Sequence, residues 1–228
     1  MSLNELLKKN ASSFHAVVPF NAKTDKLFPF DFTENNKELT ADQIANTEGF
    51  SNYINTKLKE NNCKYGIGGY DEHRTLYARS KHFDTNEEPR RLHLGIDIWG
   101  EVGTRIMSPF DGIVHSFAFN NNDSDYGATI ILTHNLEGIS FHTLYGHLSL
   151  NSIKNLQEGK RIIKGELIAE FGTRFENGNW PPHLHFQIIS DMTNYKGDYR
   201  GVCKFSEKKH WLQNSPDPDS ILQMNRYL

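Results

Sequence analysis

Cysteine is scarce in this sequence of 228 residues, which contains only Cys63 and Cys203. Two cysteines exclude a small secreted scaffold held together by disulfides, and they exclude a structural zinc site built on cysteine ligands. We expect both residues to be free thiols. Any metal site in this chain must therefore use histidine and carboxylate ligands.

Long apolar runs are also missing. No stretch of 18 apolar residues is present, so the sequence predicts no membrane-spanning helix. The N-terminus lacks the apolar run and the small-residue cleavage site of a signal peptide. From these two absences we expect a cytoplasmic protein.

Neither sign of charge dominates the sequence. The 25 basic and 28 acidic residues give a net charge of −3, and they are spread along the chain. This pattern lacks the basic footprint of a nucleic-acid-binding protein and the acidic tail of some interaction segments. We expect no nucleic-acid partner and no membrane partner, while the oligomeric state stays open.

The texture of the sequence changes along the chain. Residues 1–62 form an N-terminal extension, in which a capping box at Thr40–Gln43 and apolar residues at helical spacing predict a helix near 47–60. Residues 63–228 form a β domain with its motifs between 90 and 190, and the predicted fold class is mainly β and antiparallel. Short β-branched and aromatic runs predict strands at Gly95–Ile98, Arg105–Met107, Gly112–Ala118, Thr129–His134, Ser140–His147, Leu167–Phe171 and Leu184–Ile189.

A short pattern occurs twice within the β domain. Gly103-Thr104-Arg105-Ile106 precedes one predicted strand, and Gly159-Lys160-Arg161-Ile162 precedes another. Two similar hairpin units packed face to face would produce such a repeat.

Histidine is abundant, with 11 residues. His93 and Asp97 are four residues apart, and in a strand they share one face with Gly95, which leaves room for a metal. His183 and His185 share a face of another predicted strand. By chance, such a sequence is expected to contain the His-x-x-x-Asp spacing about 0.6 times and the His-x-His spacing about 0.5 times, so neither is specific alone. Two histidines and one carboxylate are the ligand set of a catalytic zinc site.

Five motifs of the β domain resemble a known family. They are, in order, His93-x-Gly95-x-Asp97, Ser108-Pro109-Phe110-Asp111-Gly112, Leu144-Tyr145-Gly146-His147-Leu148, Lys164-Gly165-Glu166 and His183-Leu184-His185-Phe186. Their order and spacing closely resemble the zinc endopeptidases of the lysostaphin/LytM type. The resemblance implies an antiparallel β-barrel-like sandwich, the duplicated hybrid motif, which would account for the repeat. The flanking Tyr65–Gly68 and Trp180–His183 resemble a narrower subgroup, in which this domain lies between phosphotransferase and aminotransferase domains.

The resemblance also implies roles for five residues. His93, Asp97 and His185 would be zinc ligands, and His147 and His183 the catalytic pair. Zinc with three protein ligands keeps a fourth position for water and lowers the pKa of that water to about 7. The histidine pair would take the water proton, hydrogen-bond the oxyanion and protonate the leaving amine, with either histidine as the base. The expected function is hydrolysis of a peptide bond in a peptide or peptidoglycan fragment by a zinc metallopeptidase or amidohydrolase.

Two other functions remain open for the same residues. A non-hydrolytic domain of the same fold would keep the zinc site for binding a ligand. An iron oxygenase also uses two histidines and a carboxylate, although usually with the tighter His-x-Asp spacing.

The remaining residues of interest have simpler interpretations. His134 is expected to be a hydrogen-bonded structural histidine, with a place at the rim of the site as the alternative. Arg74, Arg90 and Arg91 are expected to be solvated charges. The other histidines lack partners at a useful spacing, and they are His15, His73, His82, His115, His142 and His210.

Overall fold

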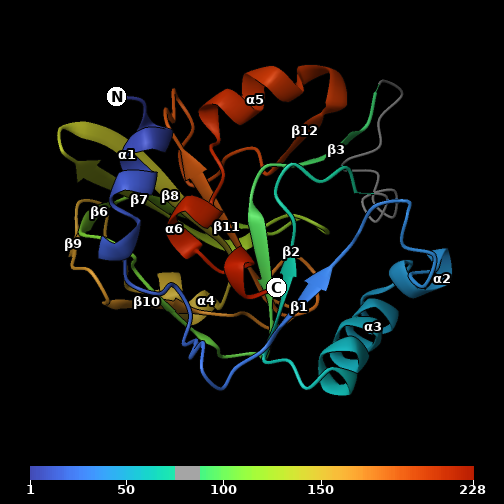
Figure 1. Cartoon of the computed structure of the whole chain (residues 1–228). Helices are drawn as coiled ribbons and strands as arrows, with labels where there is room; N and C mark the ends of the chain where they lie inside the picture. Colours follow the sequence, from blue (N-terminus) through green and yellow to red (C-terminus); the bar gives the residue numbers. More distant parts are fainter. Residues whose placement is uncertain (75–87) are drawn as a thin grey trace.

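Strands form the framework of the computed structural model, which describes residues 1–74 and 88–228 (Figure 1). His82 lies outside the described residues. The strands are β1 (Leu27–Phe30), β2 (Tyr65–Gly68), β3 (Arg90–His93), β4 (Ile96–Trp99), β5 (Arg105–Met107), β6 (Gly112–Asn120), β7 (Gly127–Leu136), β8 (Ile139–Leu148), β9 (Arg161–Ile162), β10 (Leu167–Glu170), β11 (His183–Ile189) and β12 (Val202–Lys204). The helices are α1 (Leu3–Lys9), α2 (Ala41–Ile44), α3 (Thr47–Glu60), α4 (Leu150–Ile153), α5 (Lys208–Asn214) and α6 (Asp219–Leu222), with 3-10 turns η1 (Ala11–Ser13), η3 (Phe205–Glu207) and η4 (Asn225–Tyr227).

The strands form one large sheet and two small ones. The large sheet has the order β1-β2-β4-β11-β8-β7-β6-β9, and its pairs are antiparallel except for β1 and β2. The small sheets pair β10 with β5 and β12 with β3, both antiparallel. Ile106 of β5 and Ala169 of β10 share one buried apolar cluster with Ile130 and Leu132 of the large sheet. The predicted mainly β, antiparallel fold class is confirmed.

The local predictions for strands and for one helix are also confirmed. Each of the seven predicted strands overlaps an observed strand of the β domain. The predicted helix is α3, which begins after the cap of Asn46 and ends at Asn61. The capping box of Thr40 is present, but it begins the separate short helix α2. No helix in the described part of the chain is both long enough and apolar enough to cross a membrane.

The repeated pattern has a different arrangement from the one expected. Arg105–Met107 pairs with Leu167–Glu170, the strand that follows the second copy. Arg161–Ile162 pairs with Gly112–Ile113, the strand that follows the first copy. The two units therefore exchange strands through backbone hydrogen bonds and do not pack as separate hairpins face to face.

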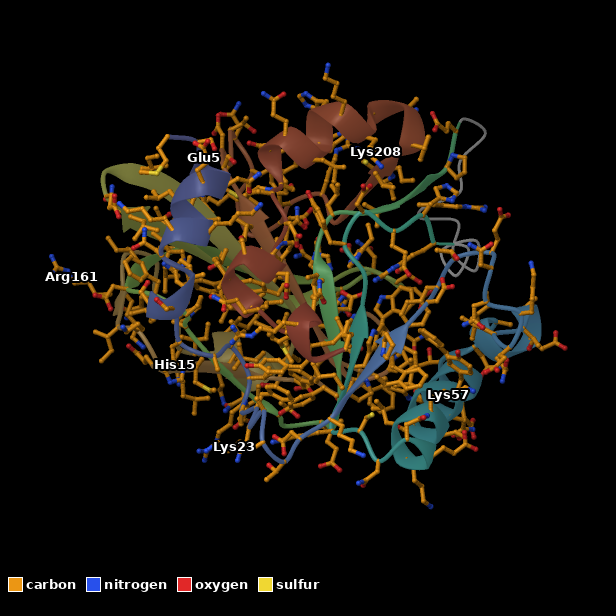
Figure 2. The ribbon with its side chains drawn as sticks, in the orientation of Figure 1. Glu5, His15, Lys23, Lys57, Arg161 and Lys208 are labelled. Carbon is orange, nitrogen blue, oxygen red and sulfur yellow. The ribbon has the colours of Figure 1, made fainter. Side chains whose placement is uncertain are left out.

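The N-terminal extension contributes to the apolar core. Leu6 and Leu7 of α1, with Val17, Val18 and Leu27, belong to the same buried cluster as the central strands. A second cluster joins Phe50 of α3 to tryptophans of the β domain, and Figure 1 shows α2 and α3 beyond the β1 edge of the large sheet. The domain boundary at residue 62 stays a prediction. Charged side chains such as Lys23 and Arg161 project from the periphery in Figure 2.

Candidate functional site

Three of the predicted site residues converge on one point. His93 ends β3, Asp97 lies in β4, and His185 lies in β11. The Nε2 atom of His93 is 3.0 Å from Nδ1 of His185 and 3.3 Å from Oδ1 of Asp97. Nδ1 of His185 is 3.1 Å from the same Oδ1. The three side chains are buried and form a triangle of potential ligand atoms.

The size of this triangle fits a tetrahedral metal ion. Zinc–nitrogen bonds of about 2.0–2.1 Å give a tetrahedron with edges of about 3.3 Å. The observed edges of 3.0, 3.1 and 3.3 Å are close to that value. Two nitrogens and one carboxylate oxygen would thus hold the ion on one side, while a fourth position stays available.

The hydrogen bonds of the two histidines leave the correct nitrogens for a metal. Nδ1–H of His93 donates to the carbonyl oxygen of Gly69 at 2.8 Å, so Nε2 keeps its lone pair. Nε2–H of His185 donates to Oε1 of Gln187 at 2.9 Å, so Nδ1 keeps its lone pair. Such outer partners fix the tautomer and ring orientation of metal-binding histidines. Sequence reasoning missed both partners.

The route by which His93 and Asp97 meet differs from the prediction. They do not share the face of one strand, because β3 ends at His93 and β4 begins at Ile96, in a different sheet. The strand register then places Asp97 opposite His185. Gly95 is nevertheless required, since a Cβ there would lie 2.5 Å from Cε1 of His185.

His147 and His183 form a stacked pair beside the triangle. Their ring centroids are 4.0 Å apart, and the other face of His183 stacks on Trp99 at 3.9 Å. Nδ1–H of His147 donates to the carbonyl of Asn177, and Nδ1–H of His183 donates to the carbonyl of Pro181, each at 2.8 Å. In both rings Nε2 is left for a ligand in the cleft.

The backbone of His147 is unusual. Its φ of +64° lies in the left-handed region, although it is not glycine. A strained conformation of this kind costs on the order of 1–3 kcal/mol and is found preferentially at functional sites. Its N–H and carbonyl bond to the backbone of Tyr126 and Gly172, which hold the conformation in place.

Burial sets the ionisation of these groups. It lowers the pKa of His93 and of His183 to about 4, and it lowers the pKa of His147 well below its ordinary value. These three histidines are therefore neutral at pH 7. Burial alone would raise the pKa of Asp97, but the electrostatic interaction with His93, the charge of Arg74 and the hydrogen bonds of the two histidines outweigh burial and hold that pKa well below its usual range.

Arg74 corrects the expectation of a solvated charge. Its side chain is 1% exposed and forms an ion pair with Oδ2 of Asp97. A second ion pair joins its Nε to Oε2 of Glu72 at 2.6 Å. No local sequence pattern signals this contact, because Arg74 and Asp97 are 23 residues apart.

One cleft with a volume of about 270 Å³ is lined by Arg74, Asp97, His147, His183 and His185. Tyr126 lies in its wall, with its ring centroid 5.1 Å from that of His185 and its hydroxyl 3.4 Å from the Nε2 atom. Trp180 lines the cleft and is also buried. Arg200 adds a cation, whose guanidinium lies 5.0 Å from the ring centroid of Trp211.

The comparison with protein families agrees with the motifs. Residues 91–197 match the sequence model described as Peptidase family M23, and this stretch contains the triangle and both stacked histidines. This matched stretch, just under half of the chain, resembles peptidase family M23. The predicted family resemblance is thereby confirmed.

Curated relatives match the same region of the chain. An uncharacterized metalloprotease of Haemophilus influenzae is 35% identical over 58% of this chain and 27% of its own length. A DD-carboxypeptidase/endopeptidase, Mpg, of Neisseria meningitidis is 30% identical over 53% of this chain and 26% of its own length. The matched region thus spans about a quarter of these relatives. The structure of lysostaphin from Staphylococcus simulans is 25% identical, with a TM-score of 0.40, over 60% of this chain and 45% of that one.

Among the residues that the structure describes, none of the other histidines lines the cleft. His134 is structural, as expected: its Nδ1 bonds to the carbonyl of Asp111 at 2.9 Å and its Nε2 to the hydroxyl of Thr143 at 2.7 Å. His134 is not among the residues that line the cleft. His15 lies near the periphery (Figure 2) and contacts the carbonyl of Ala16. Cys63 and Cys203 are free thiols, as expected.

Proposed function

We propose that this chain is a zinc-dependent metallopeptidase that cleaves a peptide bond in a peptide or a peptidoglycan fragment. The observation that carries the proposal is the triangle of His93, Asp97 and His185, two of whose members line one cleft together with two further histidines. A bound zinc ion would supply a Lewis acid that polarises the scissile carbonyl and activates water near pH 7.

His147 and His183 are proposed to handle the protons. Both are neutral at pH 7, and both hold their proton on Nδ1 through a carbonyl partner. Each Nε2 can therefore accept a proton from water and later donate it to the leaving amine. After protonation the same Nε2–H donates a hydrogen bond to the developing oxyanion. The stack on Trp99 holds His183 in place during these steps.

The names of relatives support the substrate class. One match is a DD-carboxypeptidase/endopeptidase of Neisseria meningitidis, and another is a peptidoglycan DD-endopeptidase of Vibrio cholerae. A peptidoglycan peptide is accordingly the substrate we propose. The cytoplasmic location and the narrower subgroup, in which this domain lies between phosphotransferase and aminotransferase domains, stay predictions.

Incubation of the zinc-loaded protein with muropeptides and with short glycine or D-amino-acid peptides, read by mass spectrometry, tests the proposal. We expect cleavage that stops when a chelator removes zinc. Zinc binding at one ion per chain without cleavage of any substrate would favour the non-hydrolytic binding domain. Iron in place of zinc, with oxygen consumption, would favour the oxygenase.

Variants separate the two kinds of site residue. His93→Ala and Asp97→Ala should abolish metal binding, since each removes one of three ligands. His147→Ala should keep the metal and lose turnover, because it removes a proton carrier and leaves the triangle intact. Zinc-dependent cleavage by His147→Ala at the original rate would refute the role of His147.

A further inference from the structure

The buried cation of Arg74 lies directly against a proposed metal ligand. Its Nη1 atom forms an ion pair with Oδ2 of Asp97, and its Nε atom bonds to Oε2 of Glu72. The guanidinium carbon lies 5.2 Å from the ring centroid of Phe32. A fully buried guanidinium is rare without specific partners, so this one is held in a single orientation.

The two carboxylate oxygens of Asp97 contact different partners. Oδ1 lies 3.1 Å from His185 and 3.3 Å from His93, at the corner of the ligand triangle. Oδ2 faces Arg74. A carboxylate can bind a metal through one oxygen or both, and binding through both adds a ligand to the ion. The fourth position of a zinc site would then no longer be reserved for water and substrate.

The segment that carries Arg74 also orients His93. The carbonyl of Gly69 accepts from Nδ1 of His93 at 2.8 Å and from Nη2 of Arg74 at 3.3 Å. The backbone N–H of His93 donates to the carbonyl of Glu72. At Gly68 a Cβ would lie 2.8 Å from Nη2 of Arg74, so a larger residue there would displace the guanidinium. Residues 68–74 thus form one support for two of the three ligands.

We propose that Arg74 is a positioning residue of the metal site, which holds Oδ2 of Asp97 so that the carboxylate ligates through Oδ1 alone and one coordination position stays open. This inference rests on the proposed function, because it concerns the same metal ion. It adds a residue that lies outside the motifs of the family resemblance and outside residues 91–197.

Cobalt(II) in place of zinc provides a direct readout. Four-coordinate cobalt absorbs visible light strongly, and absorption weakens when the coordination number rises, so the spectrum reports geometry without any substrate. We expect the original protein to show the strong four-coordinate spectrum. Arg74→Met should lose it while still binding one cobalt per chain. Its kcat/KM with zinc should fall about 10–100-fold, as for other outer partners of metal ligands.

Three further variants complete the experiment. Arg105→Met removes an exposed arginine and should change neither the spectrum nor kcat/KM. Arg74→Lys keeps the positive charge but loses the planar guanidinium that donates to two carboxylates. It should show more of the four-coordinate absorption than Arg74→Met does. Glu72→Gln loosens the guanidinium without removing it, and should shift the spectrum in the same direction as Arg74→Met even where that variant folds poorly.

Two results have separate meanings. If Arg74→Met and Glu72→Gln both keep the strong spectrum and the original kcat/KM, the positioning role is wrong. If the original protein binds neither zinc nor cobalt at one ion per chain, the proposed metallopeptidase function fails instead.

Discussion

Replacement of Phe50 by alanine should show that the N-terminal extension supports the cleft. Phe50 lies in α3 and is fully buried. Its ring centroid is 5.4 Å from that of Trp99 and 6.4 Å from that of Trp180, and both tryptophans line the cleft. Loss of a buried phenylalanine ring costs about 3–5 kcal/mol of unfolding free energy, because the lost transfer energy adds to the cost of the cavity. Trp99 stacks on His183 at 3.9 Å, so a shift of this tryptophan should lower kcat about 10–100-fold.

Urea denaturation followed by tryptophan fluorescence measures the first effect, and peptide hydrolysis measures the second. Phe175→Ala is the matched control, since that ring is 76% exposed and its loss should change stability by at most about 0.5 kcal/mol. A loss below about 1 kcal/mol for Phe50→Ala, with an unchanged dependence on urea, would show that α3 does not support the β domain.

Three more predictions follow from buried polar groups and from metal binding. Gln187→Leu removes the acceptor of the His185 Nε2–H bond, so zinc affinity in a chelator competition should fall about 10–100-fold. Burial lowers the pKa of His134 to about 4 in the folded protein, whereas the unfolded chain takes up its proton near pH 6.5. The free energy of unfolding should therefore decrease by about 3 kcal/mol from this group as the pH falls from 6.5 to 4, and less steeply in His134→Asn. When free zinc is held at 100 times its Kd, removing it with a chelator should lower the free energy of unfolding by about 2.7 kcal/mol. Denaturation with and without the chelator measures this loss.

Short sequence patterns predicted the strands and the helix whose formation depends on neighbouring residues. Alternating residues between glycine and proline punctuation gave the seven strands, and helical spacing gave α3. β2 was not predicted, because Tyr65–Gly68 contains two glycines and has no alternation: all four of its residues are buried. Gly66 occurs there because the ring of Phe30 lies 2.0 Å from the position its Cβ would take. That requirement exists only once β1 packs beside β2.

The five predicted site residues do lie together, but the reason assumed for His93 and Asp97 was wrong. Their spacing predicts two positions on one strand face, whereas the chain leaves one sheet at His93 and enters another at Ile96. A short spacing in the sequence predicts that two side chains lie close together in space. It does not predict which backbone conformation brings them together.

The sequence predicts some residues that contact the proposed metal ligands better than others. Gln187 lies two residues after His185 on the same face of β11, so the alternation of a strand was sufficient to predict its contact. Arg74 reaches Asp97 from another part of the chain, and a lone arginine is by default a solvated charge. Burying that cation is favourable only because Asp97 and Glu72 are both fixed beside it, which requires the finished fold. The residues that tune the proposed metal site are therefore best sought among buried charges with distant partners.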